Sequence, residues 1–116
     1  MSDAKQQDII WVKFPYSNIG EAKFRPAVVV SNNDYNKNNM DVVACAITSK
    51  LDEREYSILI DGKNMQNGKL VLKSRIRADK IMQIEKSLIA KAFARLDDKT
   101  FDLLNAEIMK LLKRAK

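Results

Sequence analysis

A charged segment that runs directly into an apolar strand constrains the fold more than any other stretch of this chain. The residues Glu21 to Pro26 continue without a spacer into four apolar residues, Ala27–Val30. Proline fixes its own φ, lacks an N–H donor and favours an extended backbone in the residue before it. We therefore expect Arg25 to be the first residue of a strand that continues through Ser31.

The absence of alternation over Ala27–Val30 is typical of a strand covered on both faces, by the domain core on one side and a partner subunit on the other. Two interpretations of Arg25 follow from its position at the edge of such a strand. It is either an anion-binding group held at the boundary of the core or a solvated residue on the rim, and charge patterning alone does not distinguish them.

Composition excludes several classes of site. The 116 residues include no histidine, which removes zinc sites of the usual kind, the serine triad and an imidazole acid–base pair. Any chemistry must then use Arg, Lys, Asp, Glu, Ser, Thr or Tyr side chains, and we expect no cofactor. The single cysteine, Cys45, lies in an apolar run, so we expect a buried thiol in a reducing compartment and no intramolecular disulfide.

The charge balance favours a polyanionic partner, because the net charge is +6 and the pI is near 9.5. The amino-terminal residues are polar, and no apolar run approaches the length of a membrane span. We therefore expect a single cytoplasmic domain over residues 1–116, without a membrane partner.

Several short strands are predicted from the apolar patterns. Residues 8–14 alternate and end at Pro15, residues 41–48 form a largely buried strand, and residues 56–60 alternate again. A further strand begins at Ser74 and can extend through Ile84. Residues 16–24 and 32–39 are predicted loops, the first a flap that carries Glu21 and Lys23.

The carboxyl-terminal third mixes an ambiguous stretch with a clear helix. Residues 86–96 fit either a helix or a short helix followed by a strand. Asp97 is a suitable N-cap, and Phe101, Leu104 and Ile108 recur at helical spacing, which predicts a helix packed on the sheet. The fold class is therefore mainly β with a C-terminal α-helix, as a small antiparallel barrel or strongly curved sheet.

Four motifs together resemble the PemK/MazF family of toxin endoribonucleases from toxin–antitoxin pairs. They are Asp8-Ile-Ile-Trp-Val-Lys-Phe, Gly20-Glu21 followed by Arg25-Pro26-Ala-Val-Val-Val-Ser31 and Tyr35-Asn36, Cys45-Ala-Ile-Thr48-Ser49, and a later segment with Ser74, Arg77, Asp79 and Ile84 to Lys86. The sequence departs from the family pattern at Gln7, Phe24 and Lys80, and its flap has no histidine.

The resemblance implies an SH3-like barrel of the PemK/MazF (CcdB-like) type that acts as a homodimer. It also implies metal-independent cleavage of single-stranded RNA at short sequences, with 2′,3′-cyclic phosphate and 5′-hydroxyl products, and an acidic antitoxin whose tail occupies the RNA groove. By position, Arg25 and Thr48 take the catalytic roles of the family, and Arg77-Ala-Asp79 matches an Arg-x-Asp pattern of some members.

Cleavage through the 2′-hydroxyl needs a base, an acid and positive charge on the developing phosphorane. Arg25 suits the charge-stabilising role, because its fork can hold two phosphate oxygens and its high pKa disfavours proton transfer. Thr48 can donate its hydroxyl, although a threonine at a strand end is also ordinary structure. Glu21 and Asp79 are the two candidate bases, and without the resemblance Arg77 and Asp79 would be interpreted as a surface ion pair.

RNA binding is expected from cations that follow the phosphate chain and from aromatic rings that stack on unpaired bases. The predicted binding residues are Lys23, Phe24, Ser31, Tyr35, Asn36, Ser49, Lys50, Arg54 and Arg75. Core packing is the alternative role for the aromatic residues, and for Trp11 it is the preferred one.

Two other functions are consistent with the sequence. The first is a non-catalytic barrel that binds RNA or protein, as an inactive toxin homologue would. The second is a gyrase poison, since a related toxin family has the same fold, but the basic carboxyl terminus from Leu111 lacks the Trp-Gly-like ending expected there.

Overall fold

The computed structural model describes residues 3–14 and 23–115. Seven strands form one antiparallel sheet in the order β4-β6-β3-β2-β1-β7-β5. The elements in chain order are β1 (Asp8–Phe14), β2 (Lys23–Val29), α1 (Asn33–Asn38), β3 (Asp41–Thr48), β4 (Ser57–Ile60), a 3₁₀ turn (Gly62–Asn64), β5 (Met65–Gly68), β6 (Ser74–Glu85), a second 3₁₀ turn (Lys86–Leu88), β7 (Ile89–Leu96) and α2 (Asp98–Leu112).

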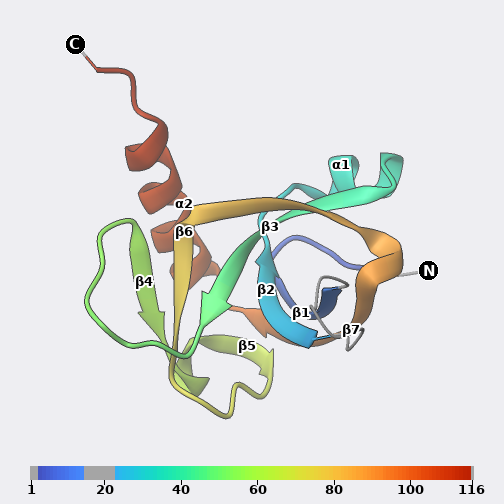
Figure 1. The fold of residues 1–116 in the computed structure, drawn as a ribbon, viewed down its shortest axis with the longest axis horizontal. Coiled ribbons are helices and arrows are strands. Elements are labelled where there is room, and N and C mark those ends of the chain that lie inside the picture. The colour runs from blue at the N-terminus through green and yellow to red at the C-terminus, as the bar shows by residue number, and fades with distance from the viewer. Residues whose placement is uncertain (1–2, 15–22, 116) are drawn as a thin grey trace.

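The sheet curls into a half-barrel, with α2 beside β4 and β6 and α1 at the opposite side of the molecule (Figure 1). This arrangement confirms the predicted curved antiparallel sheet with a carboxyl-terminal helix. Asp97 caps α2 as expected, because its carboxylate accepts a 2.7 Å hydrogen bond from the backbone N–H of Thr100. Leu104 is fully buried and anchors the helix on the sheet.

Each face of the sheet carries its own apolar core. Ile9 and Val28 belong to the first core cluster, which also contains Leu104, whereas their neighbours Ile10 and Ala27 belong to the second. Successive residues of a strand point to opposite faces, so β1 and β2 contribute to both clusters. The apolar run that follows Pro26 is therefore covered on both faces within one chain, and the expected partner subunit is not needed to explain it.

The start of β2 differs from the prediction. β2 begins at Lys23, so Lys23 and Phe24 belong to the strand and Arg25 is its third residue. Over residues 23–26 the strand pairs with β1 alone, since its pairing with β3 covers only residues 27–29. Pro26 is tolerated there because a missing N–H costs little on an unpaired strand edge.

One other segment differs from the prediction, and one ambiguity is resolved. The asparagine-rich stretch forms helix α1 rather than a loop, because the side chain of Asn32 accepts a 2.8 Å hydrogen bond from the N–H of Tyr35 and caps the helix. Gly68 has a φ of 76° at the end of strand β5. Residues 86–96 adopt the second of the two predicted forms, a 3₁₀ turn followed by β7.

A large bulge interrupts β6 where it pairs with β3. Ile47 pairs with Ile76 and Cys45 pairs with Ile81, so the single residue Ala46 lies opposite the four residues 77–80. Bulges bend a strand and redirect its side chains, and they occur often beside active sites. This bulge lies in the segment that carries the predicted Arg-x-Asp pattern.

Candidate functional site

The last three residues of β2, Ala27–Val29, pair with Ala44–Ala46 in the middle of β3, and a groove of about 1190 Å³ opens where the two strands part. Seven cationic side chains line it, and no acidic side chain does among the residues that the structure describes. The cations are Lys23, Arg25, Lys50, Lys69, Arg77, Lys80 and Lys91. Apolar and aromatic surface lies between them, so the groove suits a ligand that is anionic and partly apolar.

The groove brings together Arg25 and Thr48. Ala27 pairs with Ala46, and continuing that register by two residues brings Arg25 opposite Thr48. Arg25 is exposed and Thr48 is half-buried. The hydroxyl oxygen of Thr48 accepts a 3.2 Å hydrogen bond from the backbone N–H of Lys50, which fixes the turn that leads into the next loop. Two donors of the predicted kind thus flank the opening between the two strands.

Arg77 reaches the same groove from β6 and is held there by Asp79. Its Nε and Nη2 atoms each donate a 3.0 Å hydrogen bond to Asp79, and Arg54 donates a 3.5 Å hydrogen bond to the same carboxylate. These hydrogen bonds, chiefly those from Arg77, hold the pKa of Asp79 below its ordinary value. The ion pair is also the first cause of the raised pKa of Arg77. A low pKa weakens a carboxylate as a proton acceptor near neutral pH.

The predicted binding residues divide into two groups. Lys23, Phe24, Ser49 and Lys50 line the groove, and the side chain of Phe24 is 53% exposed. Arg54 and Arg75 do not line it among the described residues and instead hold the loop between β3 and β4. Arg75 donates hydrogen bonds to the hydroxyl of Ser57 at 3.1 Å and to the carbonyl of Leu51 at 3.4 Å. These two residues therefore support the loop that presents Lys50.

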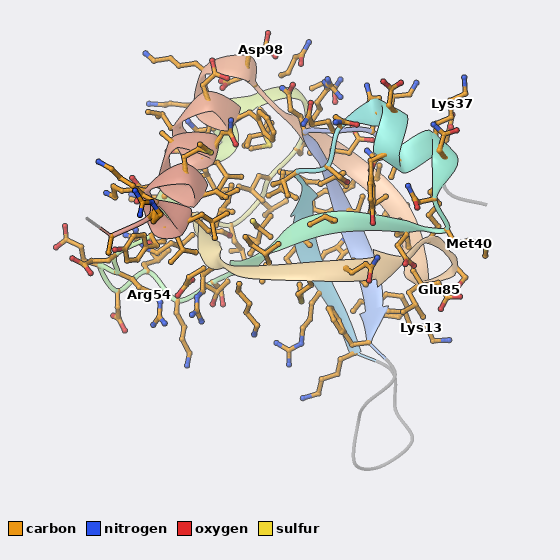
Figure 2. The ribbon with its side chains drawn as sticks, turned by 90° about the horizontal axis from the view of Figure 1, so that it is seen from above. Lys13, Lys37, Met40, Arg54, Glu85 and Asp98 are labelled. Atoms are coloured by element: carbon orange, nitrogen blue, oxygen red, sulfur yellow. The ribbon has the colours of Figure 1, made fainter. Side chains whose placement is uncertain are left out.

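Ser31, Tyr35 and Asn36 lie near α1, at the other end of β3 from the loop of Arg54, as the labels of Lys37 and Arg54 show in Figure 2. Asn36 is buried, exchanges hydrogen bonds with Ser31 and accepts one from Lys86 at its backbone carbonyl. The hydroxyl of Tyr35 accepts a 3.2 Å hydrogen bond from Gln83. Within the described residues, these three side chains tie α1 to the sheet and are not part of the groove lining.

The preferred role of Trp11 as a core residue is wrong, since Trp11 is half-buried, lines the groove and lies outside both core clusters. Its ring stacks on Phe93 of β7, with the centroids 5.2 Å apart. Phe93 packs against the first core cluster, so the two rings form a layer between that core and the groove. A partly exposed aromatic pair of this kind offers a surface on which an unpaired base can stack.

Three groove cations were missed by the sequence reasoning, namely Lys69, Lys80 and Lys91. Lys91 lies opposite Trp11 in the pairing of β1 with β7, and Lys69 follows the glycine that ends β5. Neither was predictable without those pairings. Lys80 had been noted only as a departure from the family pattern, and no role had been predicted for it.

Glu21, the other candidate base, lies outside the described residues. Cys45 is fully buried, and that burial raises the pKa of its thiol to about 12, which excludes a thiolate nucleophile at neutral pH. Across the described part of the chain, no group of three or more Cys, Asp and Glu side chains is placed to bind a metal ion. None of the helices described is long and apolar enough to cross a membrane.

The fold and the groove define the class as mainly β half-barrels with a basic groove between two parting strands. Sequence comparison then identifies the family. The family model for the PemK-like, MazF-like toxins of type II toxin–antitoxin systems matches residues 5–112, and the chain belongs to that family. Comparison with curated proteins gives no match.

Solved structures of the same fold include toxins with and without antitoxin. MazF from Deinococcus radiodurans is 19% identical, with a TM-score of 0.75 over 97% of this chain and 98% of that one. MazE-MazF from the same organism gives 17% identity and a TM-score of 0.80 over 98% and 100%. A mycobacterial endoribonuclease in complex with its cognate antitoxin is 18% identical, with a TM-score of 0.75 over 97% and 99%. At these identities the likeness concerns the fold.

Proposed function

We propose that this chain is a toxin endoribonuclease that cuts single-stranded RNA at short sequences and inhibits translation. The observation that carries the proposal is the joint presence of Arg25, Thr48 and Arg77 in one basic groove without acidic lining among the described residues. The family supports a toxin role, and solved relatives of the same fold are described as endoribonucleases.

In the proposed reaction the 2′-hydroxyl attacks the adjacent phosphorus, and the bond to the 5′-oxygen of the next nucleotide breaks. The products are a 2′,3′-cyclic phosphate and a 5′-hydroxyl, with one proton removed from the 2′-oxygen and one delivered to the leaving oxygen. Arg25 stabilises the equatorial phosphorane oxygens, with Thr48 as a hydroxyl donor to the same group. The reaction needs no metal in this proposal, because guanidinium groups supply the positive charge.

We assign Asp79 as a positioning residue for Arg77 rather than the base. Its carboxylate already accepts two hydrogen bonds from Arg77 and one from Arg54, and its pKa is lowered by them. Arg77 then adds a second guanidinium to the phosphate site. This leaves Glu21 as the proposed base, so Glu21→Gln is expected to abolish cutting.

The proposal extends to two protein partners. The toxin acts as a homodimer in this proposal. An acidic antitoxin covers the groove, because the seven cations of the groove attract an acidic partner and the family consists of toxins from toxin–antitoxin systems. Charge complementarity between such partners speeds association and makes it sensitive to salt.

The deciding experiment incubates purified protein with a long single-stranded RNA in EDTA and identifies the ends of the fragments. We expect cuts at defined sites with cyclic-phosphate ends, reduced about 100-fold or more in Arg25→Ala. Arg114→Ala removes an exposed arginine outside the groove and is the matched control. Unchanged cutting in Arg25→Ala would overturn the mechanism, and no cutting by the wild type on varied RNAs would favour a binding protein.

Thr48 is tested by two substitutions of similar size. Thr48→Val removes the hydroxyl and its hydrogen bond with the N–H of Lys50, whereas Thr48→Ser keeps the hydroxyl. We expect the serine variant to cut RNA within about tenfold of the wild type and the valine variant to lose most activity. If the two variants cut RNA equally well, the hydroxyl of Thr48 takes no part in the mechanism.

A further inference from the structure

The bulge in β6 begins and ends with a cation of the groove lining, Arg77 and Lys80. Ala46 of β3 has no paired residue in the described strand β6 and lies between the pair of Ile47 with Ile76 and the pair of Cys45 with Ile81. Extending each register by one residue leads to Arg77 from one side and to Lys80 from the other. Both continuations end at Ala46, which itself lines the groove. Arg77 and Lys80 therefore approach one position from the two sides of the bulge.

The bulge also changes which face the later side chains of β6 occupy. Ile76 and Ala78 belong to the first core cluster, whereas Ile84 belongs to the second and Met82 packs against it. Residues three apart on a regular strand point to opposite faces. Arg77 and Lys80 are three apart, yet both line the groove, because the extra residues of the bulge reverse the alternation.

The two cations differ in how their charge is compensated. The guanidinium of Arg77 is paired with Asp79, which offsets much of its charge. Lys80 is exposed, and no hydrogen bond or ion pair involves its side chain within the described part of the chain. Lys80 consequently contributes a free positive charge at the place where Arg77 contributes directional donors.

We propose that Lys80 is a substrate-binding residue that shares one phosphate group of a single-stranded nucleic acid with Arg77. A tetrahedral phosphate presents oxygens in several directions, so a guanidinium and an ammonium group can contact it together. A carboxylate presents two coplanar oxygens, which the arginine fork alone can engage, and so the pair favours phosphate over an acidic peptide. The inference deepens the proposed function and rests on it for the identity of the ligand.

The test measures the binding of a mixed-sequence 2′-deoxy oligonucleotide at several salt concentrations. This probe lacks the 2′-hydroxyl, so binding is measured without cutting. For Lys80→Met we expect affinity about tenfold lower at low salt. We also expect a plot of log K against log salt whose slope is smaller by about 0.7, because one phosphate is no longer neutralised. Lys80→Arg should keep the wild-type slope.

Lys63→Met is the matched control, because Lys63 is exposed on the 3₁₀ turn at Gly62–Asn64 and does not line the groove. Its slope should equal that of the wild type. An unchanged slope in Lys80→Met, or an equal decrease in Lys63→Met, would overturn the inference. So would an acidic peptide that binds through Lys80 when the oligonucleotide does not bind.

Cutting of RNA by the same variants separates this inference from the proposed function. If the wild type binds the oligonucleotide with the Lys80-dependent slope but does not cut RNA, the catalytic proposal fails and the phosphate site stands. If Lys80→Met slows cutting while its binding slope is unchanged, the phosphate site fails and the catalytic proposal stands.

Discussion

Arg77 and Asp79 lie two residues apart on β6 and are joined by two hydrogen bonds of 3.0 Å, from Nε and Nη2 to the two carboxylate oxygens. This geometry fixes the plane of the guanidinium, and Arg54 engages the same carboxylate from the loop between β3 and β4. Asp79 thus connects a groove-lining arginine to the loop that carries Lys50. The arrangement supports the proposed role of the carboxylate in orienting Arg77.

Asp79→Asn is expected to slow RNA cutting by roughly 10- to 100-fold, because one charged acceptor of Arg77 is replaced by a neutral one. If Asp79 positions Arg77 and does not transfer the proton, as proposed, the dependence of the rate on pH between about 5 and 8 should keep the shape of the wild type. Single-turnover cutting across that range checks both expectations. A variant that loses the acidic limb of the profile would show that Asp79 is the base.

The same ion pair should make stability depend on pH in the acid range. The pKa of Asp79 is lower in the folded protein than in the unfolded chain, so the unfolded chain binds a proton first as the pH falls. The stabilisation is present above about pH 4, the ordinary value for an aspartate, and is lost below it. Urea unfolding between about pH 5 and 2 should show a steeper loss of stability in the wild type than in Asp79→Asn. If the stability of the wild type and of Asp79→Asn falls equally with pH, the contribution of the ion pair is contradicted.

Gly68→Ala should destabilise the fold by at least about 2 kcal/mol. Gly68 has a φ of 76°, and an added Cβ would lie 2.3 Å from the carbonyl oxygen of Phe93. The substitution therefore forces β5 away from β7. Gly62→Ala is the matched control, since its Cβ would meet the carbonyl oxygen of Leu70 at an ordinary 3.5 Å. Thermal unfolding of the two variants should differ clearly, and similar midpoints would contradict the close strand approach.

Cys45 should resist thiol reagents in the folded protein. Its side chain is fully buried, and desolvation raises the pKa of the thiol to about 12, with a smaller contribution from the charge of Asp79. At pH 8 a disulfide reagent should modify the thiol far more slowly in buffer than in denaturant, because the thiolate is the reactive form. Rapid modification of the native protein would mean that the β3 core opens readily.

Local sequence patterns predicted the core of the sheet well. The bounds of β1 and β3 match the predicted strands, because β1 stops before Pro15 and β3 is an apolar run between Asp41 and Thr48. The start of β2 was misplaced because proline was interpreted as a boundary, whereas its effect depends on whether a neighbouring strand needs its N–H. Helix α1 was missed because asparagines that favour turns also cap helices.

The candidate site was predictable only where a motif carried it. Arg25, Thr48 and Arg77 were proposed from their motifs, and the structure brings all three to one groove. Trp11 was assigned to the core because alternation predicts a face but not what covers it, and that depends on Phe93 of a distant strand. Lys80 was missed because its direction depends on the count of residues in a bulge, which pairing with β3 alone defines.

The β6 bulge has an odd number of extra residues, so its length affects the direction of the later side chains more than the identity of its residues does. One residue of β3 faces four of β6, and so the excess is three. Removing a single residue from this segment would restore regular alternation. Met82 and Ile84 would then turn away from the second core cluster, and their exposed neighbours would turn into it. Substitutions within residues 77–80 alter contacts near the bulge, whereas a one-residue deletion there would invert the remaining half of β6 and disrupt the second core cluster.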